Sequence, residues 1–276
     1  MKIGRDSLLQ MIAEAELPEQ VYNSNAIENS TLTLEETERI LLEQAVMRKV
    51  SVRETFEAVN LARVIKYLWT RESYKLTVKS IELLHQMLLG GISDRFAGRI
   101  RRAGEYVRVG WYIAPPPEQV EKLLDEIILE FESDTETYFL DKIARFHLAF
   151  EHVHPFCDGN GRIGRVLINL QLANYGYPPI IIENKTKRKK YYPRFHDYQI
   201  DKSFSKFSDC LYLALTESLH KRLAYLRGSK IVKLTDYARK KKLPPTAVLN
   251  SARRQSIPAF RIAGVWEIAD DSEIDF

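Results

Sequence analysis

Apolar residues recur at three- and four-residue spacing along most of the chain, which predicts a mainly α-helical protein. The segments with this period are 6–17, 33–47, 51–70, 77–90, 117–133, 138–152, 162–175 and 205–226. Thr33 followed by Glu36 is typical of a capping-box start for the second segment. Gly176 followed by two prolines predicts the end of the helix over 162–175.

One stretch departs from the helical period. Residues 103–115, AGEYVRVGWYIAP, are rich in aromatic and β-branched side chains and carry Gly110 in the middle. This composition indicates a β-hairpin on a helical body, and an irregular loop is the alternative at this length. The three prolines that follow Ala114 end this element and precede the next helix.

Bulk composition places few limits on function. The chain has 276 residues, of which 45% are hydrophobic and 28% charged, the balance of an ordinary soluble globular protein. It has no apolar run of about 18 residues and no signal-peptide pattern. Cys157 and Cys210 make no disulfide framework. We therefore expect a cytoplasmic protein with no membrane partner.

The composition shifts at Gly228, where we expect a domain boundary that gives domains 1–227 and 228–276. Nine Lys or Arg residues and one acidic residue, Asp236, lie between Gly228 and Trp266. The pattern predicts a helix capped by Thr235, a second helix over 247–255, and a hairpin around Ala263 and Gly264.

This C-terminal pattern resembles a small winged helix-turn-helix of the excisionase type. That resemblance implies DNA binding, with Arg253 and Arg254 on the second helix facing the nucleic acid. A solvated basic module used for packing or dimerisation is an equal alternative.

The densest chemistry lies in residues 152–165, HVHPFCDGNGRIGR. A zinc site is disfavoured because no second ligand cluster accompanies this one. Cys157 as a nucleophile is disfavoured because the adjacent carboxylate of Asp158 would raise a thiol pKa. A nucleotide-binding P-loop is excluded because the Lys-Ser/Thr pair that it needs is missing.

The same stretch nevertheless has the properties of a phosphate cradle. Gly159, Asn160 and Gly161 are flexible enough to turn several backbone N–H groups toward one anion. Arg162 then begins a helix, and Arg165, three residues on, lies on the same face.

Two further residues beside the cradle suggest catalysis. Asp158 could hold Mg²⁺, which takes one or two carboxylates together with phosphate oxygens. His154 titrates in the range of a general base. The residues by themselves therefore predict a magnesium–polyphosphate site with a histidine base.

Residues 154–165 also match the Fic family signature, H-P-F-x-D/E-G-N-G/K-R-x-x-R, at every defined position. The resemblance extends over roughly residues 20–225. It implies an all-helical fold with a β-hairpin flap over the active site. It also implies transfer of AMP from MgATP to a Tyr, Ser or Thr hydroxyl of a target protein, with release of pyrophosphate.

The resemblance assigns a role to each matching residue. The implied roles are His154 as base, Asp158 as Mg²⁺ ligand, the N–H groups of Gly159, Asn160 and Gly161 with the Asn160 side chain on the α-phosphate, Arg162 on the β-phosphate, and Arg165 on the γ-phosphate. Tyr191 and Tyr192 would line the nucleotide pocket, with a core or surface tyrosine pair as the alternative. The flap would dock the target through Glu105, Tyr106, Val107, Arg108 and Val109.

A second motif, SNAIEN at residues 24–29, resembles the inhibitory motif of the family, S/T-x-x-x-E-G/N. It places Ser24, Glu28 and Asn29 on an inhibitory helix at about residues 20–30. Glu28 would pair with Arg165 and so remove it from the γ-phosphate. In some family members the same glutamate supports removal of AMP.

Several functions stay open beside adenylyl transfer. A DNA-binding regulator with a nucleotide-sensing helical domain is one, and removal of AMP or transfer of another phosphate-containing group are the others. The target protein is not specified by the sequence, so self-modification and a homodimer stay open as well.

Overall fold

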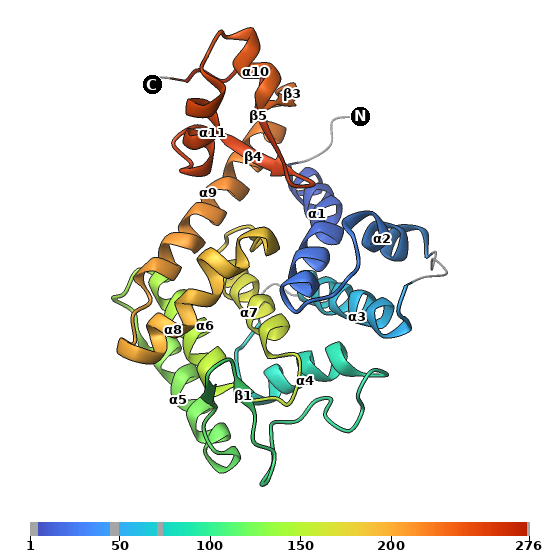
Figure 1. The fold of residues 1–276 in the computed structure, drawn as a ribbon, viewed down its shortest axis with the longest axis vertical. Helices are drawn as coiled ribbons and strands as arrows, with labels where there is room; N and C mark the ends of the chain where they lie inside the picture. The colour runs from blue at the N-terminus through green and yellow to red at the C-terminus, as the bar shows by residue number, and fades with distance from the viewer. Residues whose placement is uncertain (1–4, 45–49, 71–73, 275–276) are drawn as a thin grey trace. The chain divides into compact units, whose positions relative to one another are not determined.

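The computed structural model describes residues 5–44, 50–70 and 74–274, and these are mainly helical, as the sequence predicts (Figure 1). They form two compact units. We call Leu17–Tyr177 together with Ile181–Cys210 the helical unit. We call Met1–Glu16, Pro178–Ile180 and Leu211–Phe276 together the C-terminal unit. No described helix is both long enough and apolar enough to cross a bilayer.

Most helices belong to the helical unit, and α1 and α9 each run through both units. The elements are α1 (Arg5–Ile27), α2 (Leu34–Glu38), the π-helical turn η1 (Arg39–Glu43), α3 (Val52–Trp69), α4 (Val78–Leu89), β1 (Arg108–Val109), β2 (Tyr112–Ile113), the 3₁₀ turn η2 (Pro117–Gln119), α5 (Val120–Ser133), α6 (Phe139–Val153), α7 (Asn160–Asn174), the short turns η3 (Asn184–Thr186) and η4 (Lys187–Tyr191), α8 (Tyr192–Asp201) and α9 (Ser205–Leu226).

Helix α7 is largely enclosed, since it packs against α3, α4 and α6. Its apolar residues Ile163 and Leu167 join a core that includes Leu61, Leu84 and Phe150 from those neighbours. Polar residues in its first two turns are buried as well. A helix surrounded in this way holds its N-terminal turn rigidly.

The stretch 103–115 contains the expected hairpin, although each strand has only two residues. Arg108 pairs with Ile113 and Val109 with Tyr112, in antiparallel register. Gly110 occupies the turn with φ 59°, a left-handed conformation that glycine adopts without a steric penalty.

The C-terminal unit contains β3 (Ile231–Lys233), α10 (Leu234–Lys240), α11 (Pro245–Arg253), β4 (Ala259–Ile262) and β5 (Val265–Ala269). Its three strands form one antiparallel sheet in the order β3-β5-β4. Two local predictions were wrong here. Helix α10 begins at Leu234, so Thr235 lies inside its first turn and does not cap it. Helix α11 begins at Pro245, where proline loses no hydrogen bond, and ends at Arg253.

Three differences concern the helical boundaries. Helix α1 continues through Pro18 to Ile27, past the predicted end at residue 17. The predicted helix 33–47 is α2 followed by a π-helical turn, and its residues 45–47 lie outside the described residues. Helix α8 was not predicted, because its sequence YPRFHDYQID has few apolar residues at helical spacing.

Candidate active site

The candidate site is the turn that joins α6 to α7. Helix α6 ends at Val153, the following His154 is left-handed with φ 50°, and Gly159 precedes α7 with φ 82°. The buried Asn160 side chain closes the turn, because its Oδ1 accepts from Phe156 N and its Nδ2 donates to Phe156 O, both at 2.8 Å. The Phe156 ring stacks on the His85 ring with centroids 3.7 Å apart.

Helix α7 therefore begins at Asn160, two residues before the predicted start at Arg162. The N–H of Ile163 donates to Gly159 O at 3.0 Å, which is the first helical bond. The N–H groups of Asn160, Gly161 and Arg162 precede it in the first turn, the position whose donors attract an anion to a helix N-terminus. The Asn160 side chain is engaged with Phe156, so only its backbone N–H faces this cradle.

His154 is held in the form that a general base requires. Its ring Nδ1 lies 3.3 Å from Glu151 O. Because a carbonyl oxygen can only accept, Nδ1 carries the proton and donates, and Nε2 is left as the acceptor. Burial lowers the pKa of His154 to about 4, so the imidazole is neutral at neutral pH.

Asp158 and Arg162 lie in a ring of four alternating charges. Asp158 Oδ1 lies 3.2 Å from Arg162 Nη2, and its Oδ2 lies 2.9 Å from Arg53 Nη2. Glu57 completes the ring, with its Oε1 3.1 Å from Arg53 Nε and 3.3 Å from Arg162 Nη1. Sequence reasoning missed Arg53 and Glu57, which come from the first turns of α3. Arg162 Nε is buried without a hydrogen-bond partner among the described residues.

Arg165 is buried and contacts Ser24 and Glu28 of the SNAIEN motif. Its Nη2 donates to Glu28 Oε1 at 2.8 Å and to Ser24 O at 2.8 Å. Its Nε donates to Ser24 Oγ at 2.9 Å. A Cβ at Gly161 would overlap the Glu28 carboxylate, so glycine at this position allows the carboxylate to approach the first turn of α7.

Lys187 and Tyr192 hold the C-terminal end of α1. Asn29 is left-handed with φ 69°. Lys187 Nζ donates to Ala26 O at 2.7 Å, to Ile27 O at 3.0 Å and to Asn29 Oδ1 at 3.1 Å, and Tyr192 donates to Ile27 O at 2.6 Å. A lysine at a helix C-terminus donates hydrogen bonds to the last carbonyls, and its positive charge is stabilised by the negative end of the helix dipole.

The two tyrosines predicted to line the nucleotide pocket differ in their contacts. Tyr191 is buried, and its hydroxyl lies 3.4 Å from Arg165 Nη1 and 2.9 Å from His147 Nε2. Tyr191 thus lies next to an arginine of the cradle. Tyr192 contacts the end of α1.

His147 and Glu151 lie behind Arg165 and were also missed. Burial raises the pKa of Glu151 to about 8, with a further contribution from the negative charge of Glu28. A Cβ at Gly164 would overlap the Glu151 carboxyl and crowd the His147 ring. The sequence did contain a signal for these residues. The spacing of His147, Glu151 and His154 by four and three residues places them on one face of a helix, as a polar stripe.

The predicted flap residues have different environments. Glu105 forms a two-bond pair with Arg99, with both distances 2.7 Å, which lowers the pKa of Glu105 to about 2. Tyr106 is exposed, and only Arg108 and Val109 belong to a strand. Val107 accepts from Ala114 N at 3.0 Å, next to the paired strands.

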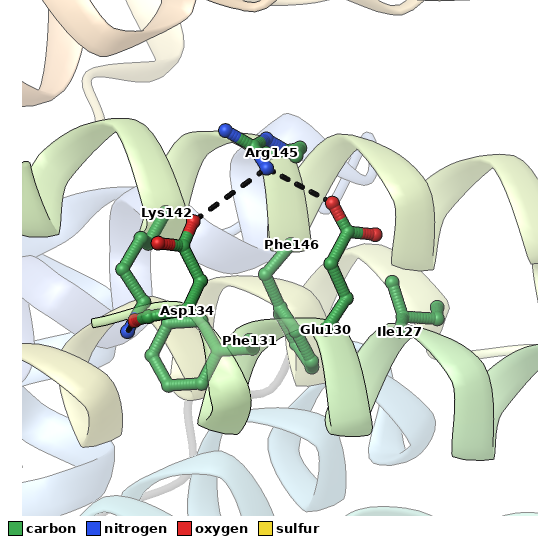
Figure 2. Close-up of a pocket in the computed structure, with 7 residues that line it drawn as sticks. All are labelled: Ile127, Glu130, Phe131, Asp134, Lys142, Arg145 and Phe146. Carbon is green, nitrogen blue, oxygen red and sulfur yellow. Dashed lines mark hydrogen bonds and ion pairs between the residues drawn. The ribbon is translucent and has the colours of Figure 1, made fainter. Parts of the chain in front are cut away.

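A hollow between α5 and α6 lies apart from these residues (Figure 2). Arg145 spans its rim, 2.9 Å from Glu130 and 3.7 Å from Asp134. Phe131 and Phe146 line it below. No predicted site residue lines this hollow, and these charges neutralise one another, so it is not the candidate site.

The comparison with protein families identifies the segment that carries this turn. Residues 75–172 match the model of the Fic/DOC family. The matched segment begins just before α4 and includes α4, α5, α6, the turn and most of α7, so it contains His154, Asp158 and both arginines of the cradle.

Named relatives and solved structures agree with this assignment. The chain is 34% identical to "Protein adenylyltransferase fic-1" of Caenorhabditis elegans over 183 residues, 64% of this chain and 35% of the relative. It is 32% identical to "Protein adenylyltransferase Fic" of Drosophila willistoni over 235 residues, 78% of this chain and 47% of the relative. The chain thus spans less than half the length of these relatives.

Two solved structures share the fold of the Fic domain and its surroundings. One is Fic-1 from C. elegans, with a TM-score of 0.69 and 27% identity over 81% of this chain and 66% of that one. The other is a Fic domain-containing signaling protein from Bacteroides thetaiotaomicron, with a TM-score of 0.73 and 22% identity over 82% of this chain and 92% of that one.

Proposed function

We propose that this protein transfers AMP from ATP to a Tyr, Ser or Thr hydroxyl of a target protein. The observation that carries the proposal is the convergence at one turn of a neutral histidine, the N–H groups at the start of α7, and two buried arginines. These groups are His154, the first turn from Asn160, Arg162 and Arg165. The names of the curated relatives support the same activity.

In the proposed reaction, His154 Nε2 takes the proton of the target hydroxyl as its oxygen attacks the α-phosphorus. A new P–O bond forms to the target, the bond between the α-phosphorus and the bridging oxygen breaks, and pyrophosphate leaves. The N–H groups of Gly159, Asn160 and Gly161 stabilise the charge on the α-phosphate. Arg162 holds the β-phosphate, and its unpartnered Nε provides a buried donor for this.

Mg²⁺ fits this site through a single carboxylate. The described residues contain no cluster of three or more His, Cys, Asp or Glu that could enclose a metal. Asp158, which is partly exposed, would hold Mg²⁺ together with phosphate oxygens and water, the coordination that this ion favours beside a nucleotide. When bound, the ion neutralises charge on the phosphates.

We further propose that Glu28 restrains the reaction. In the pair with Arg165 its carboxylate lies beside the first turn of α7 and takes the guanidinium that the γ-phosphate needs. Arg165 would hold that phosphate once Glu28 has moved away. Ser24 assists, since two of its oxygens accept from the same guanidinium, and the left-handed Asn29 follows the end of α1.

The function is tested by the mass of the protein itself. We expect the Glu28→Gly variant, incubated with ATP and Mg²⁺, to gain the mass of AMP on a hydroxyl. A gain of a different phosphate-containing group would indicate another donor chemistry, and loss of AMP from a pre-modified protein would indicate the reverse reaction. No mass change in the protein or in any protein of an added extract would contradict a transferase.

The Asp158→Asn substitution should weaken binding of Mg²⁺ without preventing binding of ATP. The amide keeps the shape but loses the charge, so we expect ATP to bind with little dependence on Mg²⁺ and transfer to fall by about 10²-fold or more. Calorimetric titration of ATP with and without Mg²⁺ measures the first effect. The matched control is Asp94→Asn, and an unchanged magnesium dependence in Asp158→Asn would remove this residue from the metal site.

We propose, as a second function, that residues 228–276 form a winged helix-turn-helix domain that binds DNA. Helix α11 exposes Thr246, Asn250 and Arg253 at helical spacing, and Arg254 follows them. Its other face is buried through Val248 and Ala252. Such a surface combines groups that contact phosphates with groups that contact bases.

The Arg253→Ala, Arg254→Ala double variant is expected to weaken binding to random duplex DNA. Each lost phosphate contact should reduce the slope of log K against log salt by about 0.9. The control is Lys79→Gln with Lys122→Gln, which removes the same charge from exposed positions of the helical unit. Equal weakening in both double variants would point to net charge alone, and no binding at low salt would exclude the function.

We place the protein in the cytoplasm, because Cys157 and Cys210 are both free thiols.

A further inference from the structure

Arg101 is a buried arginine that the proposed reaction does not use. It lies between α4 and β1, its exposed fraction is 2%, and it is among the largest fully enclosed side chains of the protein. The described residues contain no carboxylate that forms an ion pair with it. A buried charge of this kind costs free energy unless hydrogen bonds compensate for it, so the groups that Arg101 contacts indicate its structural role.

One set of contacts fixes the backbone of the catalytic turn. Arg101 Nε donates to His154 O at 2.8 Å, and its Nη2 donates to Val153 O at 3.1 Å. Its backbone N–H donates to Pro155 O at 2.8 Å. The side-chain contacts lie at the negative end of the α6 dipole, which favours a cation there. They also hold His154 in its left-handed conformation, which is unfavourable for a residue other than glycine.

A second set of contacts fixes both ends of the hairpin segment. Arg101 Nη1 donates to Glu105 O at 3.1 Å, and its Nη2 donates to Pro115 O at 2.9 Å. Glu105 precedes β1 and Pro115 follows β2, so both ends of the hairpin segment contact one guanidinium. Tyr112, in the hairpin, contacts the same turn of α6 through its hydroxyl, 3.1 Å from Glu151 O.

We propose that Arg101 is the positioning residue that sets the distance between the hairpin and His154. The inference rests on the proposed function, in which His154 takes the proton of the target hydroxyl, and on the expectation that the hairpin docks the target segment. The planar guanidinium donates in several fixed directions at once, and a lysine ammonium cannot reproduce that fork. An error of about 1 Å between hydroxyl and base can cost roughly 10²-fold in rate.

The test uses the full-length chain with Glu28→Gly as the parent and labelled ATP as the probe. Arg101→Lys keeps the charge and the aliphatic stem, and Arg101→Gln keeps an amide donor without the charge. The matched control is Arg102→Lys, since Arg102 is the exposed neighbour. Rates of AMP incorporation into the protein itself are measured well below the melting temperature of each variant, and ATP binding is measured by calorimetry.

We expect both Arg101 variants to bind ATP like the parent and to incorporate AMP about 10²-fold more slowly at saturating ATP. Arg102→Lys should match the parent in both measurements. Two results would overturn the proposal. One is a rate that is lower than the parent's only at low ATP and equals it at saturating ATP, and the other is a rate that equals the parent's at all ATP concentrations. Failure of the parent itself to incorporate AMP would instead contradict the proposed function, so the two failures are distinguishable.

A pH profile gives a second readout that loss of packing alone would not produce. The charged or titratable groups that influence His154 are Arg101, Glu28, Glu151 and Asp158, and Arg101 lowers its pKa. Arg101→Gln should therefore move the acid limb of the rate profile to higher pH. Arg101→Lys should leave that limb in place, and the same shift in both variants would contradict the proposed geometry.

Discussion

Glu28→Gly is expected to raise AMP incorporation by roughly ten- to a hundredfold. The carboxylate accepts a charge-assisted hydrogen bond from the buried Arg165, and such bonds contribute about 1.5–3 kcal/mol. Its removal frees the guanidinium for a phosphate and clears the space beside Gly161. The increase should appear as a higher rate at fixed ATP and as tighter binding of ATP.

The measurement compares incorporation of labelled AMP by the wild type and its variants. Glu28→Gln removes the charge and keeps the size of the side chain, so it should activate nearly as much as glycine does. The control is Glu35→Gln, which removes a surface glutamate paired with Arg39 and should change nothing. Labelling of Glu28→Gly at or below the wild-type level would contradict the inhibitory role.

Substitution of the Ser24 side chain should raise AMP incorporation less than substitution of Glu28 does. The hydroxyl accepts from Arg165 Nε, but the Ser24 carbonyl also accepts from Nη2 and survives any side-chain change. The end of α1 is moreover held by Lys187 and Tyr192, which contact main-chain carbonyls of that helix. Release of Glu28 therefore requires either a local rotation of its side chain or detachment of the whole helix end from Lys187.

The turn between α6 and α7 could be predicted because its determinants are local. Residues 154–165 contain the glycine, the asparagine and the arginines that form the turn, and their spacing alone places the donors together. The start of α7 was misplaced by two residues because it depends on the bonds between Asn160 and Phe156. Those bonds form only once the turn has closed, and periodicity does not report them.

The residues that support this turn could not be predicted, because they come from distant segments. Arg53 meets Asp158 across 105 positions of the chain, and Arg101 meets His154 across 53. In the sequence both are ordinary arginines in charged surroundings. Tyr191 was assigned to the pocket from the resemblance, whereas the packing against His147 that buries it is a tertiary contact.

His154→Ala is expected to lower AMP transfer by about 10²- to 10⁴-fold, the range for loss of a general base, while ATP binding changes little. The His154 ring contacts Glu151 O, the His154 carbonyl accepts from Arg101 Nε, and the residue takes no part in the proposed phosphate cradle. Rates of AMP incorporation and calorimetric titration of ATP measure the two effects in the Glu28→Gly background. The control is His220→Ala, which removes a half-buried histidine of the C-terminal unit that is bonded to Gln255.

A pH profile of the rate tests whether His154 is the base. Burial lowers the pKa of His154 from 6.5 to about 4, so the neutral form that accepts a proton is present above roughly pH 5. The rate should therefore be level across pH 5–7 and fall below that range as the imidazole gains a proton. Because burial lowers the pKa of His154, the folded state binds fewer protons than the unfolded state between about pH 4 and 6.5. The contribution of this histidine to the free energy of unfolding is therefore complete above pH 6.5 and is lost as the pH falls toward 4. Undiminished labelling by His154→Ala, or an acid limb centred near 6.5, would assign the proton to another acceptor.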